Sequence, residues 1–341
     1  MKKWGLVLII AAFMTILAAC GGDEEADAGE SSDSGDAFVI KAGHATTTEH
    51  FGHKSFEKFK ELVEENSDGK ITVEIYPNSQ LGGEREMIEA VQLGNLTMAA
   101  PSSAPLTAFS PGMYLWDIPY LFTDAAQAHK ALDGEVGQEV LDQLSEVGIK
   151  GLGYWENGFR HLFNNNVAVS SMEDMNGLKM RTLESQQQIK AWNATGANST
   201  PIAFNELYTA LQQGTVDAAE GPLALTYAQK FQEVTEYLTL TGHMYSPWPV
   251  IFNQGFYDSL PADLQTVVED AVIEARDYNR ELSAEDEGAS LELLTGEGLE
   301  LVEISDEEKA NFQEAMEVVY PEIKELAGAE LFDLLMEELG R

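Results

Sequence analysis

The sequence predicts an α/β fold in which strands and helices alternate around a parallel sheet. Short segments whose apolar and polar residues alternate with period two recur along residues 38–219, and segments with helical periodicity separate them. This order is typical of βαβ units and a parallel sheet. A helical pattern from Leu260 to about Leu294 exceeds the roughly 25 residues that are usual for a globular helix, so we expect it to span two lobes.

Two sets of α/β elements are expected along the chain. The first has strands over residues 38–44, 70–76, 96–101 and 149–155, and helices over residues 50–66, 84–93 and 124–147. The second begins near Arg160 and has strands over residues 178–182, 199–202 and 215–219, with helices over residues 185–195 and 205–213. The tail, residues 306–339, has a helical pattern with an interruption at Pro321.

The amino-terminal segment is typical of a targeting signal followed by a tether. Two lysines precede an uncharged run that ends at Ala19 and is too short to span a membrane, which indicates a secretory signal peptide over residues 1–19. Cys20 is the only cysteine, and its small neighbours resemble the lipobox of bacterial lipoproteins; an ordinary signal peptide is the alternative. Residues 20–36 then predict a lipidated Cys20 and an acidic, flexible tether.

The net charge of the chain limits the classes of partner that it can bind. The formal net charge is −38, whereas nucleic acids and anionic lipid surfaces bind clustered lysine and arginine, so the sequence excludes both as partners. A heavily solvated acidic surface suits a salty or alkaline exterior. An anionic ligand therefore needs a local cationic pocket that overcomes the global field.

Three histidines, His44, His50 and His53, lie close together near the first predicted helix. His50 and His53 are three residues apart, a spacing that zinc accepts, although a closed site needs further ligands. One hypothesis is that the histidines bind a metal ion, in an extracellular metal-binding protein or metal-dependent hydrolase. The other is that they are hydrogen-bonded surface or core residues without a metal. The chain lacks a G-x-S-x-G motif and a dinucleotide-binding glycine fingerprint, so we expect no catalytic residue and no cofactor.

Arg160 and Arg181 are the candidates for anion recognition. Arg181 ends a strand pattern, and Arg160 is expected in the loop after the strand that ends near Trp155. Open α/β sheets bind ligands at the carboxyl ends of their strands, and a guanidinium binds a carboxylate with two parallel hydrogen bonds. In one interpretation the two arginines converge on a ligand carboxylate, and in the other each pairs with a structural acid. Aromatic residues that would wall such a pocket are Trp155, Phe159, Phe204 and Tyr208.

Several ordered motifs resemble a known family. They are NSQLGGEREMIEAVQLGNLTMA (78–99), DIPYLF (117–122), NGFRHLFNN (157–165), NGLKMRTLES (176–185) and PIAFNELYTALQQGTVDAAEGP (201–222). From about Phe38 to its carboxyl terminus the chain resembles the solute-binding proteins of tripartite ATP-independent periplasmic (TRAP) transporters, of the dicarboxylate-binding type. The resemblance implies a type II-like periplasmic-binding-protein fold whose two lobes, joined by hinge strands and a long helix, close around the ligand. Lobe I is expected at residues 37–157 plus about 247–282, and lobe II at residues 158–246 plus about 283–341.

The resemblance also implies roles for individual residues. Arg181 forms a bidentate salt bridge with the ligand carboxylate, Arg160 supplies a second cationic contact, and Phe204 packs on the ligand. Many relatives carry an asparagine where this chain has Gly221, so one side-chain hydrogen bond is missing and the ligand's identity is left open. The rest of the expected ligand-binding set is Glu220, Trp155, His44, Thr47, Ser102, Ser103 and Glu84.

The function implied by the resemblance is transport without chemistry. The protein is expected outside the cytoplasm, anchored to the outer face of the cell membrane by a lipid on Cys20. It captures a C4-dicarboxylate, a sugar acid or a related carboxylate and delivers it to the membrane permease subunits. A binding module of the same fold that feeds a sensor is the alternative, and the metal-binding protein built on the histidines is a third hypothesis.

Overall fold

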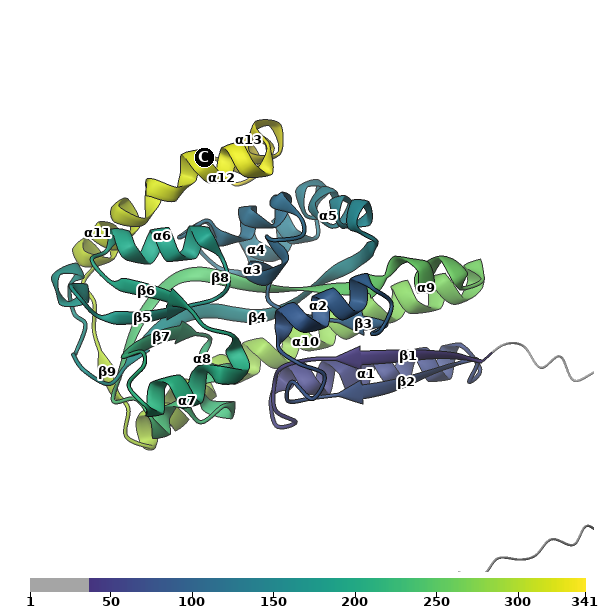
Figure 1. The fold of residues 1–341 in the computed structure, drawn as a ribbon, viewed down its shortest axis with the longest axis horizontal. Helices are drawn as coiled ribbons and strands as arrows, with labels where there is room; N and C mark the ends of the chain where they lie inside the picture. The colour runs from purple at the N-terminus through teal and green to yellow at the C-terminus, as the bar shows by residue number, and fades with distance from the viewer. Residues whose placement is uncertain (1–36) are drawn as a thin grey trace, which may run out of the picture. The chain divides into compact units, whose positions relative to one another are not determined.

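The computed structural model describes residues 37–341, so the predicted signal peptide, Cys20 and the tether lie outside the described residues. The described part of the chain belongs to one compact unit (Figure 1). Along it, no helix combines the length and the apolar character that crossing a membrane requires.

The described elements alternate as the sequence predicts. The strands are β1 (Phe38–Gly43), β2 (Ile71–Tyr76), β3 (Met98–Ala99), β4 (Ile149–Asn164), β5 (Lys179–Thr182), β6 (Asn198–Pro201), β7 (Ala218–Gly221), β8 (Tyr237–Asn253) and β9 (Glu300–Val302). The α-helices are α1 (Phe51–Asn66), α2 (Glu84–Gln92), α3 (Ser103–Leu106), α4 (Ala125–Leu132), α5 (Glu135–Asp142), α6 (Gln186–Ala194), α7 (Leu207–Gln212), α8 (Leu223–Ala228), α9 (Gln254–Ser259), α10 (Ala262–Gly296), α11 (Asp306–Met316), α12 (Tyr320–Ala327) and α13 (Ala329–Glu338). Short 3₁₀ helices are η1 (Pro111–Asp117), η2 (Gln143–Val147), η3 (Met172–Met175), η4 (Phe204–Glu206), η5 (Phe231–Glu233) and η6 (Glu317–Val319).

The sheet is mixed, which corrects the expectation of a wholly parallel one. Its order in the described part is β2-β1-β3-β8-β4-β7-β5-β6, with β9 beside β8. Strands β1, β2 and β3 are parallel to one another and form the first strand group; β5, β6 and β7 are likewise parallel and form the second. The antiparallel pair β4 and β8 lies between the groups and joins them. The α/β class is confirmed, as two parallel units on a shared central pair.

Strands β4 and β8 differ most from the sequence prediction. β4 has 16 residues and continues well past Trp155, so Arg160 lies within a strand and not in a loop. β8, with 17 residues, was not predicted, and it pairs with β4 along nearly its whole length. Three register irregularities interrupt that pairing, and Gly158 adopts a φ of 104° beside one of them. The two long strands connect both strand groups.

Helix α10 has 35 residues and confirms the prediction of a long helix. It packs against α1 and β4 near the first strand group and against α8 near the second, and Figure 1 shows it running diagonally from the α9 end toward β9. Its buried residues Val268 and Ala275 belong to one apolar core, with α1 and β2, whereas Leu294 belongs to another, with α7 and β7. The helix therefore contributes to the cores of both strand groups.

Two predicted helical segments are divided in the structure. Residues 124–147 form α4, α5 and η2, because the chain turns between Leu132 and Glu135. The turn is tight: a Cβ at Gly137, in the first turn of α5, would lie 1.9 Å from the carbonyl oxygen of Leu132 at the end of α4. In the tail, the interruption predicted at Pro321 is confirmed to within a few residues: α11 ends at Met316, η6 follows, and Pro321 lies in the first turn of α12, where proline is tolerated. A second break, which was not predicted, lies at Gly328, whose φ is 94°.

Candidate ligand-binding site

A pocket with about 370 Å³ of empty space, counting space that is open to solvent, lies where the carboxyl ends of strands from both groups face each other. From the first group come the residues that follow β1 and β3, and from the second come those at the ends of β5 and β6. The carboxyl ends of parallel strands are where α/β folds bind ligands, because loops and helix starts present free polar groups there. The lining residues are His44, Ala45, Thr46, Glu84, Ala100, Ser102, Asn157, Arg160, Arg181, Leu183, Phe204, Leu225 and Trp248.

Arg181 is an almost fully buried cation without a carboxylate partner among the described residues. Its side chain is 2% exposed, and its Nε donates a hydrogen bond to the Ile202 carbonyl oxygen at 2.9 Å. That bond fixes the plane of the guanidinium, while the terminal nitrogens make no hydrogen bond within residues 37–341. Burial lowers the pKa of Arg181 to about 10, so the group stays charged at neutral pH. A buried charge of this kind is costly unless an anion compensates it.

Arg160 lines the same pocket but already has a partner. It forms an ion pair with Glu220 of β7, donating from Nη2 to Oε1 at 2.8 Å and to the Glu220 carbonyl oxygen at 2.9 Å. A ring nitrogen of His243 lies 3.3 Å from the second carboxylate oxygen. Burial by itself raises the pKa of Glu220, but the charge of Arg160 and the hydrogen bonds outweigh it and hold that pKa far below its usual range. The pair is therefore fully ionised and cancels its own charge.

Glu84 contributes a carboxylate to the pocket lining from the first strand group. It begins α2, and its Oε1 accepts hydrogen bonds from the backbone N–H and the hydroxyl of Ser102 at 2.8 Å and 3.0 Å. Burial raises the pKa of Glu84, while the Ser102 hydrogen bonds and the charges of the two pocket arginines act against that rise. A carboxylate in the first turn of a helix is also favoured by the helix dipole.

The remaining predicted residues divide between the pocket and its surroundings. His44 and Phe204 line the pocket. His44 is neutral there at physiological pH, because burial lowers its pKa to about 3. Trp155 is buried in the core and donates to the Val272 carbonyl oxygen, and Ser103 is buried at the start of α3. Thr47 lines a different hollow. Neither Glu220 nor Gly221 lines the pocket, but a Cβ at Gly221 would lie 4.0 Å from Arg160.

The sequence-based site did not include Asn157 and Trp248, whereas Thr46 falls in the loop around His44 to Thr47 that was expected to contact the ligand. Both polar atoms of the Asn157 side chain are buried and have no hydrogen-bond partner, although the residue lies in the pocket wall. The signal for Asn157 was its place at the start of the NGFRHLFNN motif, in a strand that was predicted to end earlier. Trp248 lies between Pro247 and Pro249 on β8, which was not predicted at all. The apolar wall is completed by Ala45, Ala100, Leu183 and Leu225.

The three histidines do not form a metal-ligating group in the structure. His44 and His53 share a hydrogen bond of 3.0 Å between ring nitrogens, whereas His50 caps α1 by accepting from the Gly52 N–H. The His50 ring packs against Phe51 and Trp248. Among residues 37–341, no group of three or more histidine, cysteine, aspartate or glutamate side chains is arranged to hold a metal ion.

Two parallel strand groups on a shared central pair, with a polar pocket at their facing strand ends, define the class of the periplasmic solute-binding proteins. Residues 42–326 match the family described as "Bacterial extracellular solute-binding protein, family 7", and the chain belongs to that family. This confirms the TRAP resemblance of the sequence motifs. The family is made of binding proteins and not of enzymes.

Individual relatives are similar over most of their length. The C4-dicarboxylate-binding periplasmic protein DctP of Rhodobacter capsulatus is 38% identical over 298 residues, 86% of this chain and 88% of the relative. A sugar acid binding protein of Advenella mimigardefordensis, solved with galactonate, is 31% identical with a TM-score of 0.86, covering 88% of this chain and 97% of that one. A TRAP periplasmic solute-binding protein of Sulfurospirillum deleyianum with bound succinate is 37% identical with a TM-score of 0.83, covering 88% and 98%.

Proposed function

We propose that this protein is the extracytoplasmic binding component of a TRAP transporter and that it captures a small organic acid through Arg181. The observation that carries the proposal is a buried, charged Arg181 that faces a pocket and has no carboxylate partner among the described residues. Relatives named for a C4-dicarboxylate and for a sugar acid support a ligand with at least one carboxylate. In a chain of net charge −38, a local cation is what such an anion needs.

The proposed binding step is a charge pairing in a dry pocket. The ligand carboxylate accepts two hydrogen bonds from the terminal nitrogens of Arg181, while Phe204 and Trp248 provide apolar walls. Arg160, held by Glu220, adds polar contact without adding net charge. Desolvation strengthens the pairing relative to an exposed ion pair, because the effective dielectric constant around Arg181 is lower than that of water.

The proposed partner is a membrane permease that receives the closed, loaded form, and the proposed anchor is a lipid on Cys20. We assign the lobes to residues 37–157 plus about 247–282 and 158–246 plus about 283–341, with closure about β4 and β8. As a binding protein it performs no chemistry on the ligand. A sensor as the receiving partner is the alternative, and a neighbouring gene for a permease or for a sensor kinase distinguishes the two.

The test is calorimetry with a panel of small organic acids on the wild type and on Arg181→Met. The variant is expected to lose at least about 100-fold in affinity, because truncating one partner of a buried charge pair costs several kcal/mol. Its ligand-free melting temperature should be unchanged or higher, since an uncompensated buried charge is removed. Arg85→Met removes the same charge from an exposed pair with Glu89 and serves as the control. An Arg181→Met protein that binds like the wild type contradicts the proposal.

A further inference from the structure

Of the charged side chains that line the pocket, one is held in an ion pair by the described residues and two are not. Arg160 and Glu220 form an ion pair, so Arg181 and Glu84 are the cation and the anion of the pocket lining that have no ion-pair partner among the described residues. Neither of these two groups forms an ion pair within residues 37–341. A ligand in this pocket therefore meets a cation from the second strand group and an anion from the first.

The geometry of Glu84 defines what the anionic end accepts. Its Oε1 already takes two hydrogen bonds from Ser102, while its Oε2 accepts none from the described residues. A carboxylate has no proton to donate, so only a hydrogen-bond donor on the ligand satisfies Oε2. A ligand carboxylate at that end would instead face a like charge, which costs several kcal/mol in a desolvated interface.

Asn157 points to the same kind of ligand. Its Nδ2 and Oδ1 are both buried without a partner, so the pocket offers one donor and one acceptor at this position. A hydroxyl group donates one hydrogen bond and accepts others, and so can satisfy either atom. Leaving buried polar atoms unpaired is costly, which favours a ligand that supplies such groups.

We propose, on the basis of the function proposed above, that the ligand is a hydroxylated monocarboxylate and that Glu84 is the specificity-determining residue that disfavours dicarboxylates. The carboxylate binds Arg181, a hydroxyl donates to Glu84, and a further hydroxyl pairs with Asn157. Family membership leaves both classes open, because the named relatives include binders of each. The charge of Glu84 decides between them.

The first experiment compares matched acids on the wild-type protein by calorimetry. Erythronate, succinate, butyrate and 4-aminobutyrate share a four-carbon chain and differ in the groups that they would present to Glu84. Galactonate and adipate repeat the comparison with six carbons. We expect the hydroxy acid of each length to bind at least about tenfold more tightly than the dicarboxylate.

The second experiment uses Glu84→Gln, which keeps an acceptor for Ser102 and turns an amide donor toward the pocket. The dicarboxylate should then bind about tenfold more tightly and the hydroxy acid about tenfold more weakly, since a charged hydrogen bond becomes neutral. Glu89→Gln removes the same charge from the exposed face of α2 and should change neither affinity.

Each outcome has one meaning. A wild type that prefers the dicarboxylate, or a ratio unchanged in Glu84→Gln, overturns the inference and leaves the proposed function intact. Preference for 4-aminobutyrate overturns the hydroxyl assignment in favour of an ammonium group at Glu84. A wild type that binds no acid of the panel overturns the proposed function itself.

Discussion

Arg160 and Arg181 are equally buried, at 3% and 2% exposure, but their electrostatic states differ. Arg160 is compensated within the protein by Glu220, so it stabilises the ligand-free fold. Arg181 has no ion-pair partner among the described residues, although the charges of Glu220 and Glu84 act on it over a longer range, so it is placed to pair with a ligand anion. The difference arises because Glu220 lies opposite Leu162 in the pairing of β4 with β7, at salt-bridge distance from Arg160, whereas it acts on Arg181 only over a longer range.

The Arg160–Glu220 pair predicts a pH-dependent stability difference. Glu220→Gln leaves Arg160 buried without a carboxylate and should lower the free energy of unfolding by about 3 kcal/mol at pH 7. The folded pKa of Glu220 is depressed, so its contribution is complete above the unfolded value of 4.5 and is lost as the pH falls toward the folded pKa. Below pH 4.5 the gap between the two proteins should shrink by about 1.4 kcal/mol per pH unit.

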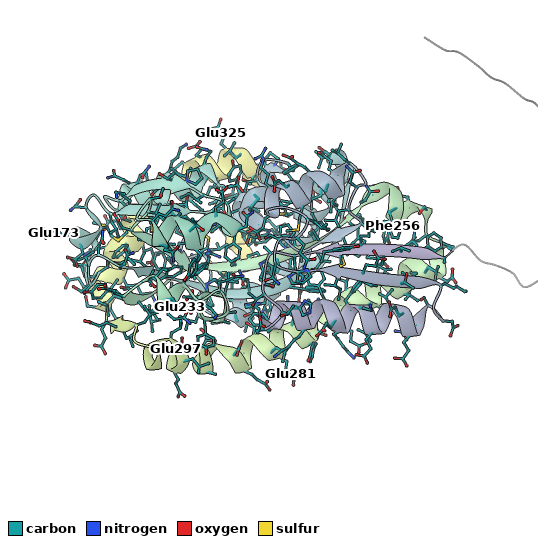
Figure 2. The ribbon with its side chains drawn as sticks, turned by 60° about the horizontal axis from the view of Figure 1, so that its bottom comes forward. Glu173, Glu233, Phe256, Glu281, Glu297 and Glu325 are labelled. Atoms are coloured by element: carbon teal, nitrogen blue, oxygen red, sulfur yellow. The ribbon has the colours of Figure 1, made fainter. Side chains whose placement is uncertain are left out.

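Urea unfolding of both proteins between pH 7 and pH 3.5 measures that gap. Glu281→Gln is the control, because Glu281 is an exposed residue of α10 that projects from the molecule in Figure 2. Its difference from the wild type should stay near zero at both pH values. A constant gap for Glu220→Gln across this range would show that the ion pair is not formed in solution.

At the residue scale, the sequence predicted the free cation better than its surroundings. Arg181 was identifiable because it ends a short alternating strand just before a helical pattern. The pairing of Arg160 with Glu220, and the place of Asn157 in the pocket, depend on β4 continuing past Trp155 and on its register with β7. Neither property is encoded in a local pattern.

At the scale of elements, the helices with a strong apolar period, α1 and α10, were predicted with nearly correct bounds, and the central strands were not. The apolar periodicity of α1 and α10 is strong over many residues. β8 contains Pro247 and Pro249, which argue against a central strand. The structure tolerates them because β3 pairs with β8 only at residues 251–252 and β9 only at residues 237–239, which leaves that side of β8 open between them.

A substitution at Gly158 tests whether β4 is the element that positions the pocket residues. Its φ of 104° is strained for any residue with a Cβ, and it lies between Asn157 and the strand segment that carries Arg160. Gly158→Ala should lower the free energy of unfolding by about 1–2 kcal/mol and weaken ligand binding, because both neighbours shift. Gly153→Ala, in the same strand at an ordinary φ, is the control and should retain wild-type affinity. Unchanged affinity in Gly158→Ala would show that the bulge does not position the site.

At the scale of the molecule, the pocket unites residues from both strand groups. Glu84 and Ser102 come from the first group, Arg181 and Phe204 from the second, and Asn157 and Arg160 from the strand that joins them. A ligand that bridges Arg181 and Glu84 therefore contacts both groups, which is how closure of a two-lobed binding protein couples to its ligand.

The acidity of the molecule and the cationic centre of the pocket act together. The formal net charge is −38, and Figure 2 shows Glu281 and Glu325 projecting from opposite sides of the ribbon. Long-range repulsion of anions is screened within about 8 Å at physiological salt, so a buried arginine dominates locally. The net charge could be predicted from composition, whereas the absence of an ion-pair partner for Arg181 among the described residues required the fold.

The most direct test of the account is a crystal structure of the protein with the hydroxy acid that it binds most tightly. We predict the ligand carboxylate at about 2.7–2.9 Å from both terminal nitrogens of Arg181, with a hydroxyl donating to Glu84 and the Arg160–Glu220 pair intact. A ligand whose carboxylate binds Arg160 with Glu220 displaced, or which lies in another hollow while Arg181 is left without an anion, would contradict it.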